Sequence, residues 1–262
     1  MTSARKPPLR DPFSPVARAG GFTMLELLVV MALVVGLIGF ALSALNSAKV
    51  TAATAVCSNN LRQLSSVVSL YAADHGDCYP AYETTNPDGS RTWYFGLETT
   101  PAGTAEGDRD LDPTQGPLYP YIQEVGKIEI CPAFNYGSAL WKPKFQGASY
   151  GYGYNWILGG TINGQPLNTA NLSSAEVMLF ADCGQVNTFQ PPASASNPMM
   201  EEFYLIDSTD KTFHFRHLGK ANVLFVDGHV ELLPPYTGTT DTRIPGQIFG
   251  RVTPVGSNDM LK

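Results

Sequence analysis

The chain has 262 residues, of which 44% are hydrophobic and 15% are charged, and its formal net charge at pH 7 is −6. This length and composition are typical of one exported domain with an anchor. Because nucleic-acid binding requires a basic face, the acidic balance argues against a nucleic-acid partner.

The first predicted element is a basic leader peptide over residues 1–21, which precedes a long apolar segment. From Phe22 to Ala44 there is one charged residue, Glu26, and no proline. A helix over this range is about 35 Å long, enough to cross a hydrocarbon core of roughly 30 Å. We therefore predict a transmembrane helix over residues 22–45, with the leader kept in the cytoplasm by the positive-inside rule and the remainder translocated.

Glu26 is the exception within the apolar segment. A carboxylate in a membrane helix costs roughly 2.5–3.5 kcal/mol on insertion scales, so it is expected to have a function. Gly21, Phe22, Glu26 and the unbroken apolar helix together resemble the prepilin signal of type IV pilins and type II secretion pseudopilins. The resemblance implies that a prepilin peptidase cleaves after Gly21 and N-methylates Phe22. It also implies that Glu26 neutralises the Phe22 amine of a neighbouring subunit during filament assembly.

The same resemblance implies a single-pass protein of the inner membrane with a periplasmic head, and later a periplasmic or cell-surface filament. An ordinary secretory signal peptide fits less well, because its apolar region has only about 7–15 residues. A plain signal anchor explains the length of the apolar segment but not Glu26.

The helical pattern continues beyond the apolar segment. Apolar residues from Ala48 to Tyr71 recur at spacings of three and four, the period of an amphipathic helix. We predict one continuous helix from Phe22 to about Ala73, whose second half, residues 46–75, packs its apolar stripe on a head formed by residues 76–262. The expected fold class is α+β: a long N-terminal helix and an antiparallel β-sheet head, as in the pilin-like fold.

Two further motifs resemble a subgroup of pilin-like proteins of Planctomycetes, Verrucomicrobia and their relatives. The first is Asn60-Leu61-Arg62-Gln63-Leu64 on the helix, followed by a Tyr-x-x-Asp-x-Gly turn over residues 71–76. The second is His217 followed after nine residues by Asp227-Gly228, the H-X9-DG pattern of a C-terminal domain in that subgroup.

Four cysteines follow the apolar segment: Cys57, Cys78, Cys131 and Cys183. In an oxidising compartment they allow three pairings, and we favour a Cys131–Cys183 disulfide over free buried thiols. None belongs to a C-x-x-C pair, so a zinc knuckle is not expected.

Residues 81–116 are rich in Thr, Gly, Pro and Asp, which predicts loops with one short strand at most. Their carboxylates, Glu106, Asp108, Asp110 and Asp112, are possible calcium ligands, but they lack the spacing of an EF-hand. We interpret this segment as a solvated acidic loop.

Two strands are predicted in the centre of the head. The alternation of Tyr and Gly over residues 149–156 places Tyr150, Tyr152 and Tyr154 on one face of a strand, as a packing surface. Residues 176–182 form an apolar run bounded by serines and a glycine, which is typical of a buried strand.

Asp227-Gly228 lies between two apolar-rich runs and predicts a hairpin with strands over residues 222–226 and 229–233. The expected turn is type I′, with positive φ at both Asp227 and Gly228. We interpret His217 and Asp227 as a buried hydrogen-bonded pair that fixes the hairpin. The tail, residues 234–262, is expected to be extended or loosely packed.

A zinc site built from His214, His217, Asp227 and His229 is the alternative interpretation. Side chains alternate along a strand, so His214 and His217 are expected on opposite sides, which favours the structural role. No metal or cofactor is therefore predicted.

The sequence as a whole predicts a non-enzymatic filament subunit whose partners are the prepilin peptidase, the inner membrane, copies of itself and other pilin-like subunits. The alternatives are a minor pseudopilin or adhesin that binds a ligand or metal through its head, and a membrane-tethered metal-dependent hydrolase. The sequence does not choose between a pilus and a secretion pseudopilus.

Overall fold

The computed structural model describes residues 20–100, 103–105, 107–122, 128–146, 150–162, 165–169, 175–206 and 209–254. Most of the expected leader, Glu106 and residues 255–262 therefore lie outside the described residues. The chain forms two compact units, residues 1–47 and residues 48–262.

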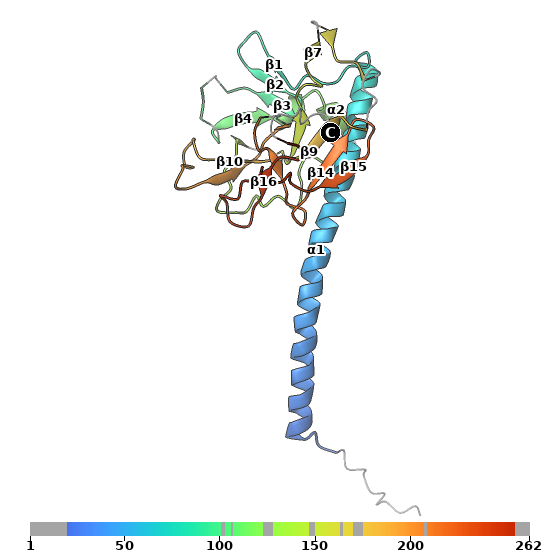
Figure 1. Cartoon of the computed structure of the whole chain (residues 1–262), viewed down its shortest axis with the longest axis vertical. Helices are drawn as coiled ribbons and strands as arrows, with labels where there is room; N and C mark the ends of the chain where they lie inside the picture. The colour runs from blue at the N-terminus through green and yellow to red at the C-terminus, as the bar shows by residue number, and fades with distance from the viewer. Residues whose placement is uncertain are drawn as a thin grey trace, which may run out of the picture. The chain divides into compact units, whose positions relative to one another are not determined.

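One helix, α1 (Met24–Asp74), confirms the long helix expected from the apolar spacing (Figure 1). It ends where Gly76 and Asp77 adopt positive φ angles of 66° and 59°. The Asp77 amide donates to the Ala72 carbonyl at 2.8 Å, which closes the last turn of the helix.

The part of α1 that belongs to the second unit buries one stripe of side chains. Cys57, Leu61, Leu64, Val67 and Val68 are each at most 3% exposed. Their spacings of three and four residues put them on one face of the helix, as predicted.

The stripe packs against a five-stranded sheet whose order is β12-β6-β9-β14-β15. Strands β12 and β6 are parallel and the other neighbours are antiparallel, so the expectation of a purely antiparallel sheet is wrong at this edge. The strands are β6 (Tyr152–Asn155), β9 (Met178–Asp182), β12 (Leu205–Ile206), β14 (Ala221–Phe225) and β15 (Val230–Leu233).

Every residue of β9 and β14 is buried, because the sheet is covered on both faces. Leu224 packs in the core that contains the stripe of α1, whereas Val223 and Phe225 pack in a second core with Phe213 and Phe215. This alternation is what a strand between two cores requires. It confirms the buried strand predicted for residues 176–182.

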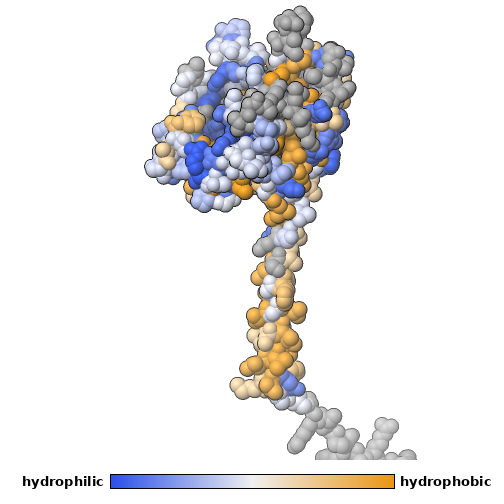
Figure 2. All heavy atoms as spheres, viewed as in Figure 1, coloured by the Kyte–Doolittle hydropathy of each residue, from blue (hydrophilic) through white to orange (hydrophobic). Residues whose placement is uncertain are grey.

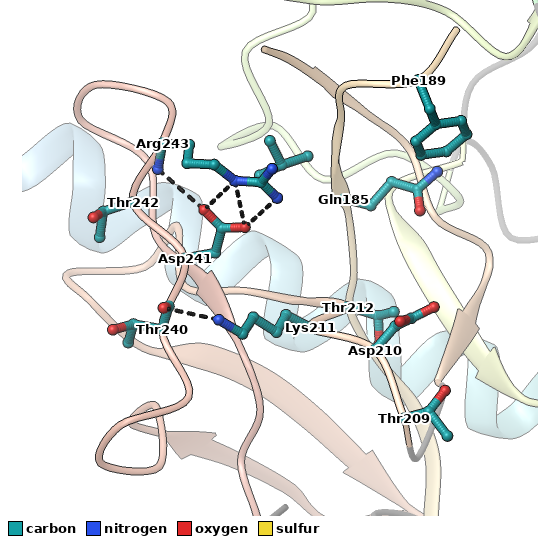
Figure 3. A pocket seen from close by; sticks show the side chains of 11 residues that line it. Gln185, Phe189, Thr209, Asp210, Lys211, Thr212, Thr240, Asp241, Thr242 and Arg243 are labelled. Carbon is teal, nitrogen blue, oxygen red and sulfur yellow. Dashed lines mark hydrogen bonds and ion pairs between the residues drawn. The ribbon is translucent and has the colours of Figure 1, made fainter. Parts of the chain in front are cut away.

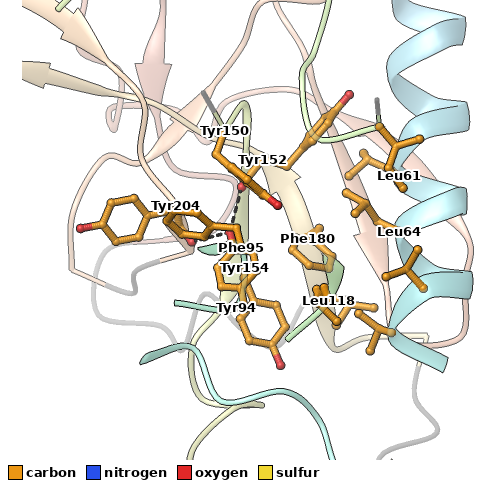
Figure 4. Packing of buried hydrophobic residues seen from close by; sticks show 14 of the residues in the cluster. Leu61, Leu64, Tyr94, Phe95, Leu118, Tyr150, Tyr152, Tyr154, Phe180 and Tyr204 are labelled. Atoms are coloured by element: carbon orange, nitrogen blue, oxygen red, sulfur yellow. Dashed lines mark hydrogen bonds between the residues drawn. The ribbon is translucent and has the colours of Figure 1, made fainter. Parts of the chain in front are cut away.

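Aromatic side chains fill the core on the helix side of the sheet, as Figure 4 shows. Tyr150, Tyr152 and Tyr154 are all buried, which confirms their packing role, although Tyr150 precedes β6. The Tyr94 hydroxyl lies within hydrogen-bonding distance of the Tyr152 and Tyr204 carbonyls, at 3.2 and 3.1 Å, and so connects the ring to β6 and to the residue before β12.

Four strands of a second five-stranded sheet lie in the region where loops were expected, residues 81–116, so that expectation is wrong. The strands of this sheet have only two to four residues, too few for an alternation of apolar and polar residues to be recognised in the sequence. They are β1 (Glu83–Thr85), β2 (Arg91–Trp93), β3 (Gly96–Glu98), β4 (Arg109–Asp112) and β5 (Phe145–Gln146), and the helical turns η1 (Pro113–Gln115) and α2 (Tyr119–Ile122) follow β4.

The tail is packed rather than loose over its described part. Phe249 is 0% and Ile244 1% exposed, and β16 (Phe249–Gly250) pairs with β13 (Phe213–His214). The other short pairs are β7 (Thr161–Ile162) with β8 (Gln165–Pro166) and β10 (Gln185–Asn187) with β11 (Met199–Glu201).

The hairpin β14–β15 confirms the predicted strand pair but not the predicted turn. Gly228 has a φ of 87°, whereas Asp227 is not among the residues with positive φ. The Gly228 amide donates to the Phe225 carbonyl, and the Phe225 amide donates to the His229 carbonyl, both at 2.9 Å. This is a three-residue loop with a glycine in the left-handed region, so only Gly228 needs the freedom that glycine provides.

Candidate functional site

Helix α1 begins immediately after the expected cleavage site. Glu26 Oε2 accepts hydrogen bonds from the Thr23 amide and the Thr23 hydroxyl, both at 2.8 Å. The Glu26 amide donates to the Thr23 hydroxyl at 3.2 Å. These reciprocal bonds form a capping box, in which a Thr before the helix and a Glu three residues later satisfy each other's amides.

This role of Glu26 was not predicted, although Thr-x-x-Glu before an apolar run is the known sequence signature of a capping box. The capping box gives Glu26 a local function within its own subunit. The Thr23 bonds do not use all the acceptor positions of Glu26, because the two oxygens of a carboxylate offer about four. Glu26 can therefore cap its own helix and still face a cationic group of another molecule.

The apolar side chains of the first unit point outward on all sides of α1. Leu25, Leu28 and Leu37 are 72%, 68% and 68% exposed. Figure 2 shows the hydrophobic residues following one another along this part of the helix. Among the described residues, α1 is the one helix long and apolar enough to cross a membrane, and none of its most apolar stretch is buried.

A cluster of buried polar side chains lies in the head, and its centre is Asp182 at the end of β9. The side chain is 0% exposed. Its Oδ1 accepts from Arg216 at 2.8 Å, and its Oδ2 accepts from the amide and side chain of Asn222 at 2.7 and 3.0 Å. Burial alone would raise the pKa of Asp182, but the charge of Arg216 and the hydrogen bonds from His217 and Asn222 hold the pKa below its ordinary value.

Arg216 extends this cluster toward His214 and the backbone. It donates to the carbonyls of Gly151 and Cys183, the latter at 3.0 Å, and its guanidinium lies over the Phe134 ring. His214 stacks on Phe249 and bonds to Gln247 at 2.8 Å. Burial, and next the charge of Arg216, lower the pKa of His214 to about 3, so His214 is neutral at physiological pH.

His217 links the cluster to helix α1, and the expected His217–Asp227 pair is wrong. His217 Nε2 lies 3.1 Å from Asp182 Oδ2 and 3.4 Å from Cys131 Sγ, and Nδ1 lies 3.1 Å from the Thr54 hydroxyl. Asp227 instead pairs with His229 at the half-exposed tip of the hairpin. The partner was missed because Asp182 ends a different strand, and sequence spacing carries no information about that contact.

The disulfide also differs from the expected one. Cys57 on α1 pairs with Cys131, with Cα atoms 5.4 Å apart, whereas Cys183 is a free buried thiol and Cys78 is free and partly exposed. Burial raises the pKa of Cys183 to about 12, so this thiol stays protonated. The Cys131–Cys183 prediction failed because it assumed a link within the head and ignored the helix.

The remaining expected ligand groups are dispersed. His214, His217 and the Asp227–His229 pair have separate partners, so the proposed zinc site of these four does not form. In the acidic segment, Asp110 lies on β4 and Asp112 Oδ1 accepts from the Thr114 amide at 2.9 Å to cap η1.

A polar cleft of about 740 Å³ opens on the head between β10 and the segment before β16 (Figure 3). Lys211 donates to the Thr240 carbonyl at 3.2 Å, and Arg243 forms a bidentate pair with Asp241. Phe189, 66% exposed, stands at its edge. The cleft therefore combines paired charges with one exposed aromatic ring.

No family model matches the chain, and no significant match was found among curated proteins or solved structures.

Proposed function

We propose that the chain is a non-enzymatic structural subunit of a type IV pilus-like or type II secretion pseudopilus filament. The observation that carries the proposal is the start of α1: a helix that begins two residues after Phe22, holds Glu26 in its first turn and exposes apolar side chains on all sides. These features agree with the prepilin-like pattern of the sequence.

The exposed helix surface provides the means of assembly. In the inner membrane, residues 22–44 contact lipid, with the leader cytoplasmic and the head periplasmic. In the filament, the same side chains contact the helices of neighbouring subunits. Burying one leucine side chain away from water contributes about 1.5–3 kcal/mol of favourable free energy. The helix can therefore leave the membrane without a large loss of free energy only if neighbouring subunits cover its apolar side chains.

Glu26 supplies the polar part of this assembly step. After cleavage behind Gly21, Phe22 carries a free amine close to an apolar helix. A charge in such surroundings is costly without a partner. The Glu26 carboxylate of an adjacent subunit provides that partner while its own Thr23 bonds hold it in position.

Processing is tested by comparing two neighbouring glycines. Gly21→Leu removes the small residue at the expected cleavage site, whereas Gly20→Leu is the matched control one residue earlier. We expect an uncleaved precursor on a denaturing gel for the first variant and a mature chain for the second. Normal processing of Gly21→Leu would refute the assigned site.

Assembly is tested by separating the charge of Glu26 from its capping role. Glu26→Gln keeps a side-chain acceptor for Thr23 but removes the charge, whereas Thr23→Ala removes half of the capping box and keeps the charge. We expect both variants to be processed, and only Glu26→Gln to be excluded from isolated filaments. Incorporation of Glu26→Gln at the wild-type level would exclude the charge-pairing role.

A minor subunit at a filament tip is the second candidate, favoured by the polar cleft beside Phe189. A repeating subunit is present in most positions of an isolated filament, whereas a tip subunit is present in about one copy. Quantitative mass spectrometry of filaments separates the two.

A further inference from the structure

The disulfide and the buried polar cluster meet at one point of the head. Sγ of Cys57, Sγ of Cys131, an oxygen of Asp182 and a ring nitrogen of His217 all lie within 4.8 Å of one another. All four side chains are buried. Cys57 lies on α1, and Cys131 lies in the segment between α2 and β5. Asp182 ends β9, and His217 lies between β13 and β14.

We propose that, when the Cys57–Cys131 disulfide is reduced, the head binds one Zn²⁺ ion through these four side chains. Two thiolates, an imidazole and a carboxylate are ligand types that zinc accepts in a tetrahedral site. Binding involves no change in oxidation state: each thiol, and the Nε2 nitrogen of His217 that faces Asp182, gives up its proton as its bond to zinc forms. The disulfide form and the zinc form exclude each other, because zinc binds cysteine as a thiolate and the sulfurs of a disulfide are not thiolates.

The distances fit a tetrahedral site after a small adjustment. With zinc–sulfur bonds of about 2.3 Å and zinc–nitrogen or zinc–oxygen bonds of about 2.0–2.2 Å, neighbouring ligand atoms lie about 3.3–3.8 Å apart. His217 Nε2 is already 3.1 Å from Asp182 Oδ2 and 3.4 Å from Cys131 Sγ. Reduction breaks the sulfur–sulfur bond and lets the two sulfurs separate to the distance that a shared metal requires.

The surrounding hydrogen bonds already orient two of the ligands. A histidine that binds zinc through one ring nitrogen usually bonds a protein group through the other, and here Nδ1 of His217 meets the Thr54 hydroxyl. The Asp182 carboxylate is held at Oδ1 by Arg216 and at Oδ2 by Asn222. A ligating carboxylate needs such outer bonds to keep its direction.

Charge is balanced in both forms of the cluster. With the disulfide formed, the charges of Asp182 and Arg216 cancel each other. With zinc bound, the ion and Arg216 supply three positive charges, and the two thiolates and Asp182 supply three negative charges. A buried group without net charge avoids most of the desolvation cost, so Arg216 suits the zinc form as well as the disulfide form.

Both forms join α1 to the rest of the head at the same place, one through a covalent bond to Cys131 and the other through the metal. All four ligands belong to the head, so zinc binding is independent of the proposed filament function.

The test uses the full chain in detergent micelles, with and without a phosphine reductant. Both samples receive zinc sulfate, are freed of loose metal by gel filtration, and are analysed for zinc per chain. We expect about one zinc per reduced chain and background zinc in the disulfide form. Cys183→Ser, which removes a buried cysteine outside the group, should retain zinc, whereas Cys57→Ser should fall to background. Equal zinc in both forms, or no zinc in the reduced form, would overturn the proposal.

A second measurement avoids variants that fold poorly. The reduced wild-type chain is alkylated with and without zinc, and the modified cysteines are located by peptide mass spectrometry. Zinc should slow the alkylation of Cys57 and Cys131 at least tenfold and leave the partly exposed Cys78 unchanged. Equal protection of all cysteines, or none, contradicts the assigned ligands. Cobalt in place of zinc should give the sulfur-to-metal absorption of thiolate ligation, and its absence contradicts them as well.

Discussion

The two halves of α1 form one continuous helix, but their side chains lie in opposite environments. In the first unit, Leu25 and Leu37 are exposed, whereas in the second unit Leu61 and Leu64 are buried against the sheet. The difference lies in the pattern of the residues, apolar all round before Ser47 and apolar on one stripe after it. The second half builds the head, and the first half has its apolar surface available for lipid or other chains.

The carboxylates follow the same division. Glu26 is held by Thr23 within one helical turn, so its bonds need nothing outside α1. Asp182 is held by residues far away in sequence, Arg216, His217 and Asn222. The acid of the first unit is therefore a local feature, and the acid of the head depends on the complete fold.

The largest effect is expected from Asp182→Asn. It removes the charge that compensates Arg216, whose side chain is 2% exposed. Breaking one partner of a buried ion pair costs about 3–5 kcal/mol of unfolding free energy, which chemical denaturation monitored by tryptophan fluorescence measures. Asp241→Asn breaks the pair with Arg243, whose side chain is 54% exposed, and should cost less than about 1 kcal/mol. Similar losses in both variants would contradict the central role of Asp182.

A pair of leucines on α1 tests the comparison most directly. Leu64→Ala leaves a cavity against the sheet and should cost about 2–5 kcal/mol in the unfolding of the head. Leu37→Ala changes a side chain that is 68% exposed and should leave that unfolding free energy unchanged. Destabilisation of the head by Leu37→Ala would contradict this division of the helix into two halves.

Reduction of the disulfide should have the next effect. Cys57 and Cys131 are separated by 74 residues, and a link across such a loop contributes about 2–4 kcal/mol. We expect reductant, with a chelator present to remove metals, to lower the unfolding free energy by this amount. The Cys78→Ser/Cys183→Ser double variant should respond to reductant like the wild type, and Cys57→Ser should not respond.

The smallest effect, per pH unit, comes from His214. The pKa of His214 is about 3 in the folded chain, below its ordinary value of 6.5. Between these two pH values the unfolded chain therefore binds a proton at this residue that the folded chain does not bind. Stability is therefore full above pH 6.5 and falls as the pH drops toward 3, by roughly 1 kcal/mol per unit. His214→Gln should flatten this slope between pH 6 and 4, whereas a variant of the exposed His229 should keep it. An equal slope in His214→Gln would show that other groups cause it.

Several features could be predicted from the sequence because their causes are local. The uninterrupted apolar spacing predicts α1, the run before Asp182 predicts β9, and Asp227-Gly228 predicts the hairpin. Each depends on a repeating pattern or on a turn residue, and both are visible in the sequence letters.

The missed features are contacts between distant segments. Cys57 lies within the predicted helix, and nothing in its sequence neighbourhood indicates Cys131 as its partner. Asp182 ends a buried strand, so its bond to His217 depends on the pairing of β9 with β14. The packed tail was not predicted, because β16 has only two residues and the turn-type residues around Phe249 indicated loops.

The disulfide also determines how the molecule would carry mechanical tension. A pull along the N-terminal half of α1 enters the head at Ala48 and reaches Cys57 soon afterwards. There the cross-link transfers the tension to Cys131, so the chain between these two cysteines is removed from the path of the force. That chain includes Leu61, Leu64 and strands β1 to β4, which tension along α1 would leave undisturbed.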